Sequence, residues 1–160
     1  MIRISLHPSA ADIEIRPIEL DDSDICALAD LINQEEKQSE EFSIEHIEER
    51  IIDVKTSRNA EILVAEKKDD SIIGYAHINQ IISLKEEPFA ELRSISVDKD
   101  HKDNGIEEKL LKAVEEWSRK KGFGKLVYSS QIKNDIEHTF FEKQNYKKNK
   151  QYHSFSKSLK

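Results

Sequence analysis

The stretch that decides the fold is AELRSISVDKDHKDNGIEEKLLKAVEEWSRKK, residues 90–121. An apolar strand over residues 92–97 runs through a short polar turn into an amphipathic helix that begins after Gly105 and ends near Gly122. A strand that delivers a helix N-terminus through a glycine-containing turn points backbone N–H groups at one place, and this arrangement predicts an anion-binding turn. The apolar face of the helix consists of Ile106, Leu110, Ala113, Val114 and Trp117.

Working outward, the rest of the chain predicts further strands and helices. Residues 13–18 alternate as a half-buried strand does, and Pro17 places that strand near an edge or an end of its sheet. Asp21 to Asp24 offer N-caps for a helix with apolar residues at 25, 28, 31 and 32, and residues 44–54 repeat isoleucine and valine at helical spacing. The runs 60–66 and 72–80 flank the turn KKDDS and predict a hairpin. Residues 125–129 predict a strand, 136–143 a short helix, and 152–159 a closing strand.

Size and composition favour a single, highly solvated globular domain. The chain has 160 residues, of which 37% are hydrophobic and 36% charged. No apolar run reaches membrane-spanning length and the start lacks a secretory signal, so we expect a cytoplasmic protein without a membrane partner. The single cysteine, Cys26, lies within an apolar series and is expected to be a buried structural thiol.

Charge is distributed unevenly along the chain. Residues 1–98 carry 23 acidic and 10 basic side chains, a balance of −13, whereas residues 99–160 carry 9 and 15, a balance of +6. The C-terminal part therefore suits a polyanion and the N-terminal part a cation, although both could be merely solvated faces. Nucleic-acid binding is disfavoured because the chain as a whole is acidic and has no basic–aromatic strip.

Other familiar site chemistries find no match in the sequence. The six histidines are scattered, no Cys–His spacing fits a metal site, and we expect no metal. Motifs for a serine nucleophile, a P-loop or a dinucleotide fold are not found.

The predicted order β-α-α-β-β-β-α-β-α-β gives a mixed sheet with packed helices, an α/β (α+β) arrangement. This order resembles that of the GNAT N-acetyltransferase superfamily, and the resemblance extends from Ile13 to Leu159. It implies a GNAT-like acyl-CoA N-acyltransferase fold, with residues 1–12 as an N-terminal extension and residues 13–160 as a single domain.

The turn within the opening stretch resembles the acyl-CoA binding motif of this superfamily. Lys102 stands at the usual Arg or Gln and keeps a positive charge, Gly105 stands where expected, and Glu107 replaces a small residue with a carboxylate that repels phosphate. Ordinary helix capping also explains acidic residues at this helix start. The resemblance implies that backbone N–H groups cradle the CoA diphosphate over Lys102, Asp103, Asn104, Gly105, Ile106 and Glu107.

A second resemblance lies at FFEKQNY, residues 140–146, which is similar to the FYEKxGF element of the superfamily. It implies that Asn134 and Phe141 flank the CoA arm. Phe141 stands at the tyrosine that often protonates the leaving thiolate. Without that hydroxyl, the candidate acids are Tyr128, Tyr146 and Tyr152. Asn145 can adopt the left-handed backbone that glycine usually supplies.

Further roles are implied for the strand that precedes the turn. Its backbone at Ile95, Ser96 and Val97 would bind pantetheine, and Glu91 matches an acidic position that deprotonates the amine directly or through water. An acidic cluster follows the first predicted helix and would favour a cationic acceptor if it faces the cleft. A solvated helix face and a partner-binding surface are the alternatives. The cluster contains Glu35, Glu36, Glu40, Glu41, Glu45, Glu48 and Glu49.

The resemblance thus implies an N-acetyltransferase that uses acetyl-CoA as co-substrate. The acetyl group would pass to a primary amine of a small molecule or peptide by direct attack, since the sequence offers no plausible acyl-enzyme nucleophile. Two other classes stay open: a GNAT-like binding or regulatory module with weakened catalysis, and a protein-interaction scaffold. A homodimer is compatible with either.

Overall fold

The computed structural model describes residues 10–35 and 40–160, which fall into two compact units, Met1–Ser129 and Ser130–Lys160. The predicted strands and helices up to residue 143 are confirmed within a few residues at each end. The first unit contains η1 (Ala10–Asp12), β1 (Ile13–Pro17), α1 (Asp22–Asn33), α2 (Ile44–Thr56), β2 (Ala60–Lys67), β3 (Ile72–Ile81), β4 (Phe89–Val97), η2 (Lys99–His101), α3 (Ile106–Lys120) and β5 (Leu126–Tyr128). The second unit contains α4 (Asp135–Lys143).

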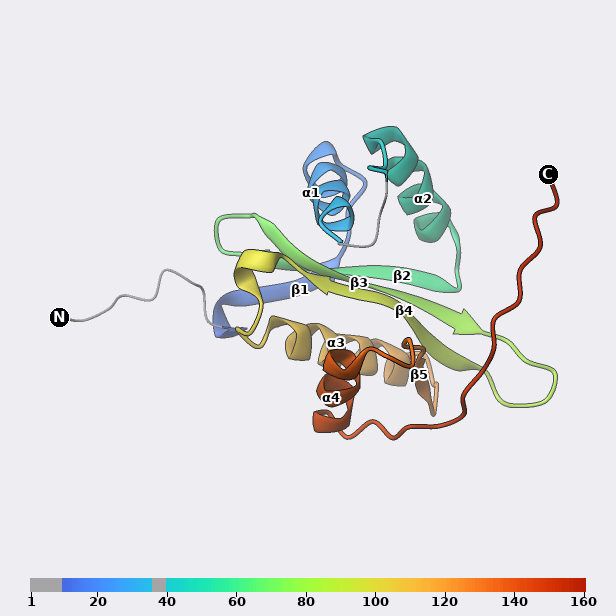
Figure 1. The fold of residues 1–160 in the computed structure, drawn as a ribbon. Coiled ribbons are helices and arrows are strands. Elements are labelled where there is room, and N and C mark those ends of the chain that lie inside the picture. Colours follow the sequence, from blue (N-terminus) through green and yellow to red (C-terminus); the bar gives the residue numbers. More distant parts are fainter. Residues whose placement is uncertain (1–9, 36–39) are drawn as a thin grey trace. The chain divides into compact units, whose positions relative to one another are not determined.

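The first unit is a mixed sheet with helices on both faces (Figure 1). Its strand order is β1-β2-β3-β4-β5, and every neighbouring pair is antiparallel except β4 and β5, which are parallel. Helices α1 and α2 cover one face and α3 covers the other (Figure 1). Pro17 ends β1, an edge strand, as its sequence position predicts, because proline cannot donate a ladder hydrogen bond.

Two apolar layers hold these helices on the sheet. On the α1/α2 face, Leu28 and Ile51 are almost fully buried against β2 and β3 residues such as Val64. On the other side, Leu110 and Val114 of α3 have no exposed surface at all. Burial of such side chains stabilises the fold by about 1.5–3 kcal/mol each, so the periodicity of the sequence was a reliable guide here.

Gly74 of β3 lets α3 approach the sheet closely. A Cβ atom at this position would lie 3.0 Å from the carbonyl oxygen of Ser96 and 3.1 Å from Cδ1 of Leu110. Both contacts are tighter than ordinary packing allows. The close approach therefore fixes the distance between α3 and the strands β3 and β4.

Arg16 joins β1, α1 and β2 through an ion-pair network. Its guanidinium donates two hydrogen bonds to Asp24, at 2.7 and 2.9 Å, and a further one to Glu66 at 2.6 Å. Asp24 is 3% exposed and also accepts a hydrogen bond from the backbone N–H of Glu19. The hydrogen bonds from Arg16 hold the pKa of Asp24 below its usual value, although burial opposes this shift.

The second unit is organised around the end of α4. Asn145 has a left-handed backbone (φ 66°), as its place in the sequence predicts. The N–H of Asn145 bonds the carbonyl of Glu142 and the N–H of Tyr146 bonds that of Phe141, both at 3.0 Å. This is a Schellman motif, and the ring contact between Phe141 and Tyr146 is the apolar contact that commonly accompanies it.

Two sequence expectations are wrong. Residues 152–159 form no strand, because nothing among the described residues pairs with them in a ladder; Phe155 is 92% exposed and Leu159 is 91% exposed. The thiol of Cys26 is exposed rather than buried, since the buried face of α1 falls on the neighbouring positions Ile25, Leu28 and Ala29.

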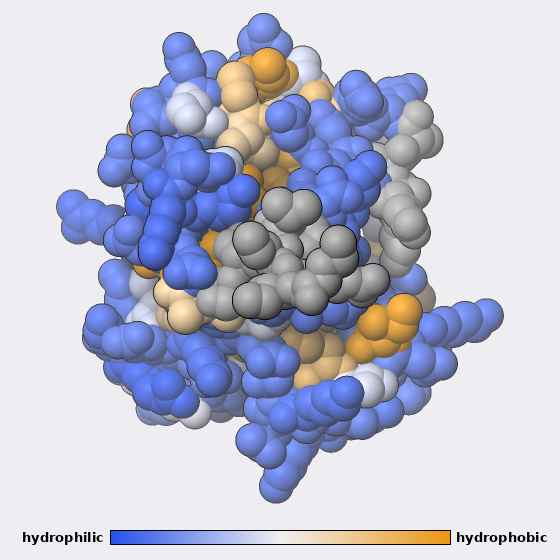
Figure 2. All heavy atoms as spheres, turned by 90° about the vertical axis from the view of Figure 1, so that its left-hand side faces the viewer, coloured by the Kyte–Doolittle hydropathy of each residue, from blue (hydrophilic) through white to orange (hydrophobic). Residues whose placement is uncertain are grey.

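The surface at one end of the first unit is mostly hydrophilic. Figure 2 views the molecule from the side on which the β2–β3 turn and η2 lie in Figure 1, and apolar side chains appear there only in small patches. Within residues 10–35 and 40–160, no helix combines the length and the apolar character needed to cross a membrane.

We expect Gly74→Ala to lower the free energy of unfolding by about 1–3 kcal/mol, because the added methyl group overpacks the contact between β3, β4 and α3. Urea denaturation followed by circular dichroism measures this change. Gly124→Ala is the matched control, since a Cβ atom there meets nothing within 4 Å. Equal stability of the two variants would contradict the close-packing argument.

We expect Asp24→Asn to cost about 3 kcal/mol at pH 7, because it leaves the Arg16 cation without its main partner. The pKa of Asp24 is lower in the folded protein than its ordinary value of 3.8. Its contribution to the free energy of unfolding is therefore complete at a pH above 3.8, and it is lost as the pH falls through the pKa of the folded state. Denaturation at pH 7 and pH 3 should thus show a smaller difference in the free energy of unfolding between the wild type and the variant at pH 3. Asp22→Asn, at an exposed position of the same helix, should match the wild type at both pH values.

Candidate functional site

The candidate site begins at the edge of β4. Strand β5 pairs with β4 over three residues only, from Ala90 to Leu92, whereas β3 pairs with β4 as far as Val97. Backbone groups alternate sides along an antiparallel strand. Because the N–H of Asp98 bonds the carbonyl of Ile73 in β3, the N–H and C=O groups of Ile95 and Val97 point to the opposite side, which β5 leaves open.

A β-bulge lies where the two strands part. His77 of β3 pairs with Ser94 and the next residue, Ile78, pairs with Leu92, so Arg93 is an extra residue in β4. A bulge bends its strand and increases the local twist. The end of β5 and the bulge in β4 thus coincide, and together they open a fork within the first unit.

The turn after β4 leads from this edge to the start of α3. Asp98 caps η2 by accepting a hydrogen bond from the N–H of Asp100, at 2.9 Å. Asp103 (φ 67°) and Gly105 (φ 76°) both have left-handed backbones, and α3 begins at Ile106. Gly105 is the N-cap residue and has no side chain to bond the first-turn N–H groups of α3. These groups are therefore suited to an anion, as the sequence predicts.

Charged side chains around the turn have opposite effects on the binding of an anion. Lys102 is exposed and able to reach an anion, whereas Glu107 lies in the first turn of α3, where the helix dipole stabilises a carboxylate. Lys109 is engaged elsewhere, because its ammonium donates to the carbonyls of Ala10 and Ile13. The turn therefore fits a diphosphate through its backbone and one cation, and Glu107 opposes such a ligand.

The sheet face beside the fork carries polar side chains under α1 and α2. Tyr75 of β3 is 6% exposed and donates a hydrogen bond of 2.8 Å to Glu35, which follows α1. Burial, reinforced by Glu35, raises the pKa of the Tyr75 hydroxyl. On the next residue of this face, burial lowers the pKa of His77, whose Nε2 has no hydrogen-bond partner among the described residues. No sequence pattern indicates the Tyr75–Glu35 contact, because it joins positions 40 residues apart.

Glu91 lies on β4 just before the fork. Its Oε1 accepts a hydrogen bond of 2.8 Å from Nη1 of Arg93, and its side chain is 21% exposed. The carboxylate is thus accessible from solvent and is held in place by the bulge residue itself.

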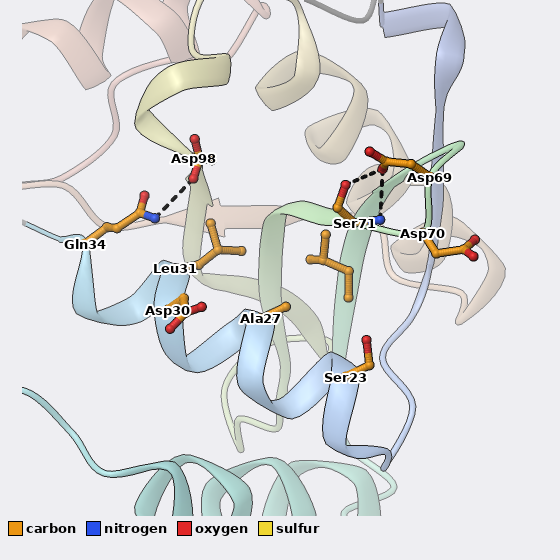
Figure 3. A pocket seen from close by; sticks show the side chains of 10 residues that line it. Ser23, Ala27, Asp30, Leu31, Gln34, Asp69, Asp70, Ser71 and Asp98 are labelled. Carbon is orange, nitrogen blue, oxygen red and sulfur yellow. Dashed lines mark hydrogen bonds between the residues drawn. The ribbon is translucent and has the colours of Figure 1, made fainter.

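A pocket of about 510 Å³ lies on the α1 side of the sheet, between α1 and the β2–β3 turn (Figure 3). Four carboxylates line it, and Gln34 donates a hydrogen bond of 3.1 Å to one of them, Asp98. Burial raises the pKa of Asp98, but bonds from the N–H of Asp100, from Gln34 and from His101 outweigh it and lower the pKa. Among the described residues that line the pocket there is no lysine or arginine, and this lining suits a cation. Its acidic residues are Asp30, Asp69, Asp70 and Asp98.

The predicted site residues are divided between the units. Glu91, the strand residues 95–97 and the turn residues 102–107 belong to the first unit, and Asn134 and Phe141 to the second. Asn134 is the N-cap of α4 and accepts a hydrogen bond from the N–H of Glu137. Phe141 contacts Phe140 and Tyr146 edge to face.

The acidic cluster that follows α1 is mostly solvated. Glu45, Glu48 and Glu49 are exposed on α2, and Glu40 and Glu41 are exposed before it. Glu35 is the member that bonds a residue of the sheet face, and Glu36 lies outside the described residues. A solvated helix face therefore accounts for most of the cluster.

Solved structures with this fold are numerous. The aminoglycoside 6′-N-acetyltransferase AAC(6′)-Ih of Acinetobacter baumannii superposes with a TM-score of 0.75 at 18% identity, over 92% of this chain and 99% of that one. An aminoglycoside acetyltransferase from a soil metagenome, in complex with sisomicin, gives 0.77 at 20% identity, over 94% and 98%. AAC(6′)-Iy, in complex with a CoA-containing bisubstrate analogue, gives 0.74 at 16% identity, over 92% and 99%.

These identities establish the shared fold. No curated protein sequence matches the chain. The sequence profile of the acetyltransferase (GNAT) family, however, matches residues 25–146, which include β4, the turn and α3 as well as α4. A match over this much of the chain shows that the protein belongs to the acetyltransferase (GNAT) family.

Proposed function

We propose that the protein transfers an acetyl group from acetyl-CoA to a primary amine. The observation that carries this proposal is the continuity of the open β4 edge with the start of α3, which has no side-chain cap at Gly105. An extended chain of amide groups such as pantetheine can pair with the open backbone, and the diphosphate attached to it then falls at the helix N-terminus. Family membership supports the same co-substrate.

Two parts of acetyl-CoA, pantetheine and the diphosphate, have a proposed partner in the first unit. The backbone of Ile95 to Val97 would bond pantetheine. Backbone N–H groups between Lys102 and Glu107 would bond the diphosphate, with the ammonium of Lys102 as an additional charge. The roles assigned to Asn134 and Phe141 stay predictions.

In the proposed reaction, the amine attacks the thioester carbonyl directly. The ammonium first loses one proton to Glu91, directly or through a water molecule. The neutral amine then forms the C–N bond, its nitrogen loses a second proton to water, and the C–S bond breaks with CoA leaving as a thiolate. Arg93 holds the carboxylate of Glu91 beside the closed end of the fork, where β5 still pairs with β4. Cys26, the chain's only cysteine, is exposed on α1, which argues against a thiol acyl-enzyme.

A cationic acceptor fits the negative charge of the N-terminal part of the chain. Residues 1–98 have a balance of 23 acidic to 10 basic side chains, and the pocket in Figure 3 adds four carboxylates on one side of the sheet. A negative surface attracts polycationic amines over a distance of about 8–10 Å at physiological salt. The similar structures include aminoglycoside acetyltransferases, whose substrates are amines of this kind.

A binding or regulatory module with weak catalysis is the second candidate. Glu107 at the turn and Phe141 in α4 favour it, because one repels a diphosphate and the other lacks a proton to donate. Such a protein would bind acyl-CoA weakly and turn it over slowly.

Acetyl-CoA should raise the thermal unfolding temperature of the purified protein. A ligand present at about 100 times its dissociation constant adds about 2.7 kcal/mol to the free energy of unfolding. A thermal-shift titration with acetyl-CoA, CoA and ATP measures this effect, and the first two should stabilise more than ATP. No shift with any of them at millimolar concentration would reject the proposed function.

Removing the charge of Glu107 should tighten acetyl-CoA binding. We expect Glu107→Gln to lower the dissociation constant roughly fivefold, for about 1 kcal/mol of relieved repulsion near the surface. Isothermal titration calorimetry measures the constant. Glu107→Ala also removes the bulk of the side chain, so its comparison with Glu107→Gln separates the effect of size from the effect of charge. Glu116→Gln, at an exposed mid-helix position, controls for the change in net charge. An unchanged constant in Glu107→Gln would refute the repulsion argument.

A further inference from the structure

The proposed reaction leaves one proton unassigned. When the C–S bond breaks, the CoA sulfur departs as a thiolate, and a nearby acid assists by donating a proton. Phe141 stands where the family pattern has a tyrosine, and its ring packs against Phe140 and Tyr146. A benzyl side chain has no proton to give, so the acid must come from another residue or from water.

The positions of the four tyrosines narrow the choice. Tyr152 is 76% exposed in a segment without regular structure. Tyr146 belongs to the second unit, whereas β4 and β5 belong to the first. The hydroxyl of Tyr75 is buried and donates to Glu35. Tyr128 is the last residue of β5 and is partly buried.

Tyr128 marks the fork between the strands. It pairs with Leu92, the last residue of β4 that β5 reaches, and the next residue of β4 is Arg93, the bulge. Neighbouring strands lie about 4.8 Å apart, so the side chain of Tyr128 starts within one strand spacing of the open edge. Tyr128 is partly buried at this end of β5.

The direction of the proposed co-substrate places its sulfur at the same point. The diphosphate would lie at the start of α3, beyond Val97, and pantetheine would run back along the β4 edge toward Ile95. The thioester at the far end of pantetheine then lies where β4 and β5 come together, beside Arg93 and Tyr128. The open edge is thus bounded by a phosphate-binding turn at one end and a phenol at the other.

We propose that Tyr128 is the general acid of the acetyl transfer. Its O–H gives a proton to the CoA sulfur as the C–S bond breaks, which yields neutral CoA thiol and a phenolate that regains its proton from solvent. The substrate ammonium loses two protons in all, one to Glu91 before the attack and one to water after the C–N bond has formed. Glu91 passes its proton to solvent and the phenolate regains one, so each cycle yields the neutral amide and the CoA thiol and releases one proton. This inference rests on the proposed function.

The test compares Tyr128→Phe with the wild type, using acetyl-CoA and its selenoester analogue with a polyamine or aminoglycoside as acceptor. Selenolate is a much more stable leaving group than thiolate and departs without a proton. We expect kcat with acetyl-CoA to fall roughly 100-fold, at the low end of what general acids contribute, and kcat with the selenoester to stay within about threefold of the wild type. Tyr152→Phe is the matched control and should behave as the wild type with both donors.

Thermal shift with acetyl-CoA separates the alternatives. A normal shift in Tyr128→Phe shows that the variant is folded and binds the co-substrate. Equal losses with thioester and selenoester, or no loss with either, would overturn the role of Tyr128, and so would a wild type that binds acetyl-CoA without acetylating any amine. The absence of a shift in the wild type would instead reject the proposed function itself.

Discussion

A single extra residue in β4, Arg93, is the constraint on which the rest of the first unit depends. Before the bulge, Leu92 is on the α3 face of the sheet; after it, Ile95 and Val97 are on that same face, an odd number of positions later. Without the insertion, strict alternation would turn the apolar side chains of one half of β4 toward the wrong layer. The pairing with β5 ends at the same point, so the position that keeps the apolar face continuous is also where the backbone edge of β4 becomes open.

The position of α3 transmits this constraint to the turn. Gly74 allows Leu110 to approach the β3–β4 backbone, and α3 is thereby held with its N-terminus just beyond the open edge. Lys109 ties the first turns of the same helix to the start of β1. The start of α3, where the diphosphate is proposed to bind, is thus positioned by packing and by the partly buried Lys109, whereas Lys102 and Glu107 in the turn carry opposite charges.

Much of the fold could be predicted because helix caps, helix ends and apolar periodicity are local features of the sequence. Asp21 and Ser43 cap α1 and α2 by accepting hydrogen bonds from N–H groups three residues on, and Gly122 and Asn145 end helices with left-handed backbones. The prediction failed where strand pairing determines the structure. A strand at 152–159 needs a neighbouring strand to pair with, and the periodicity of its own residues does not show whether one is there. The bulge, the Glu91–Arg93 hydrogen bond and the Tyr75–Glu35 contact depend on register and on long-range packing, which the sequence does not display.

Cys26 has a practical consequence beyond its failed prediction. It is the chain's only cysteine and is exposed on α1, between buried Ile25 and the half-buried Ala27. Oxidation can therefore yield just one covalent product between two copies, a single intermolecular disulfide, which a reductant prevents. The same thiol accepts one maleimide fluorophore per chain without displacing a core side chain. A dye at this position reports from the helix that lines the acidic pocket, so ligand-induced changes near that pocket can be followed by fluorescence without introducing any mutation.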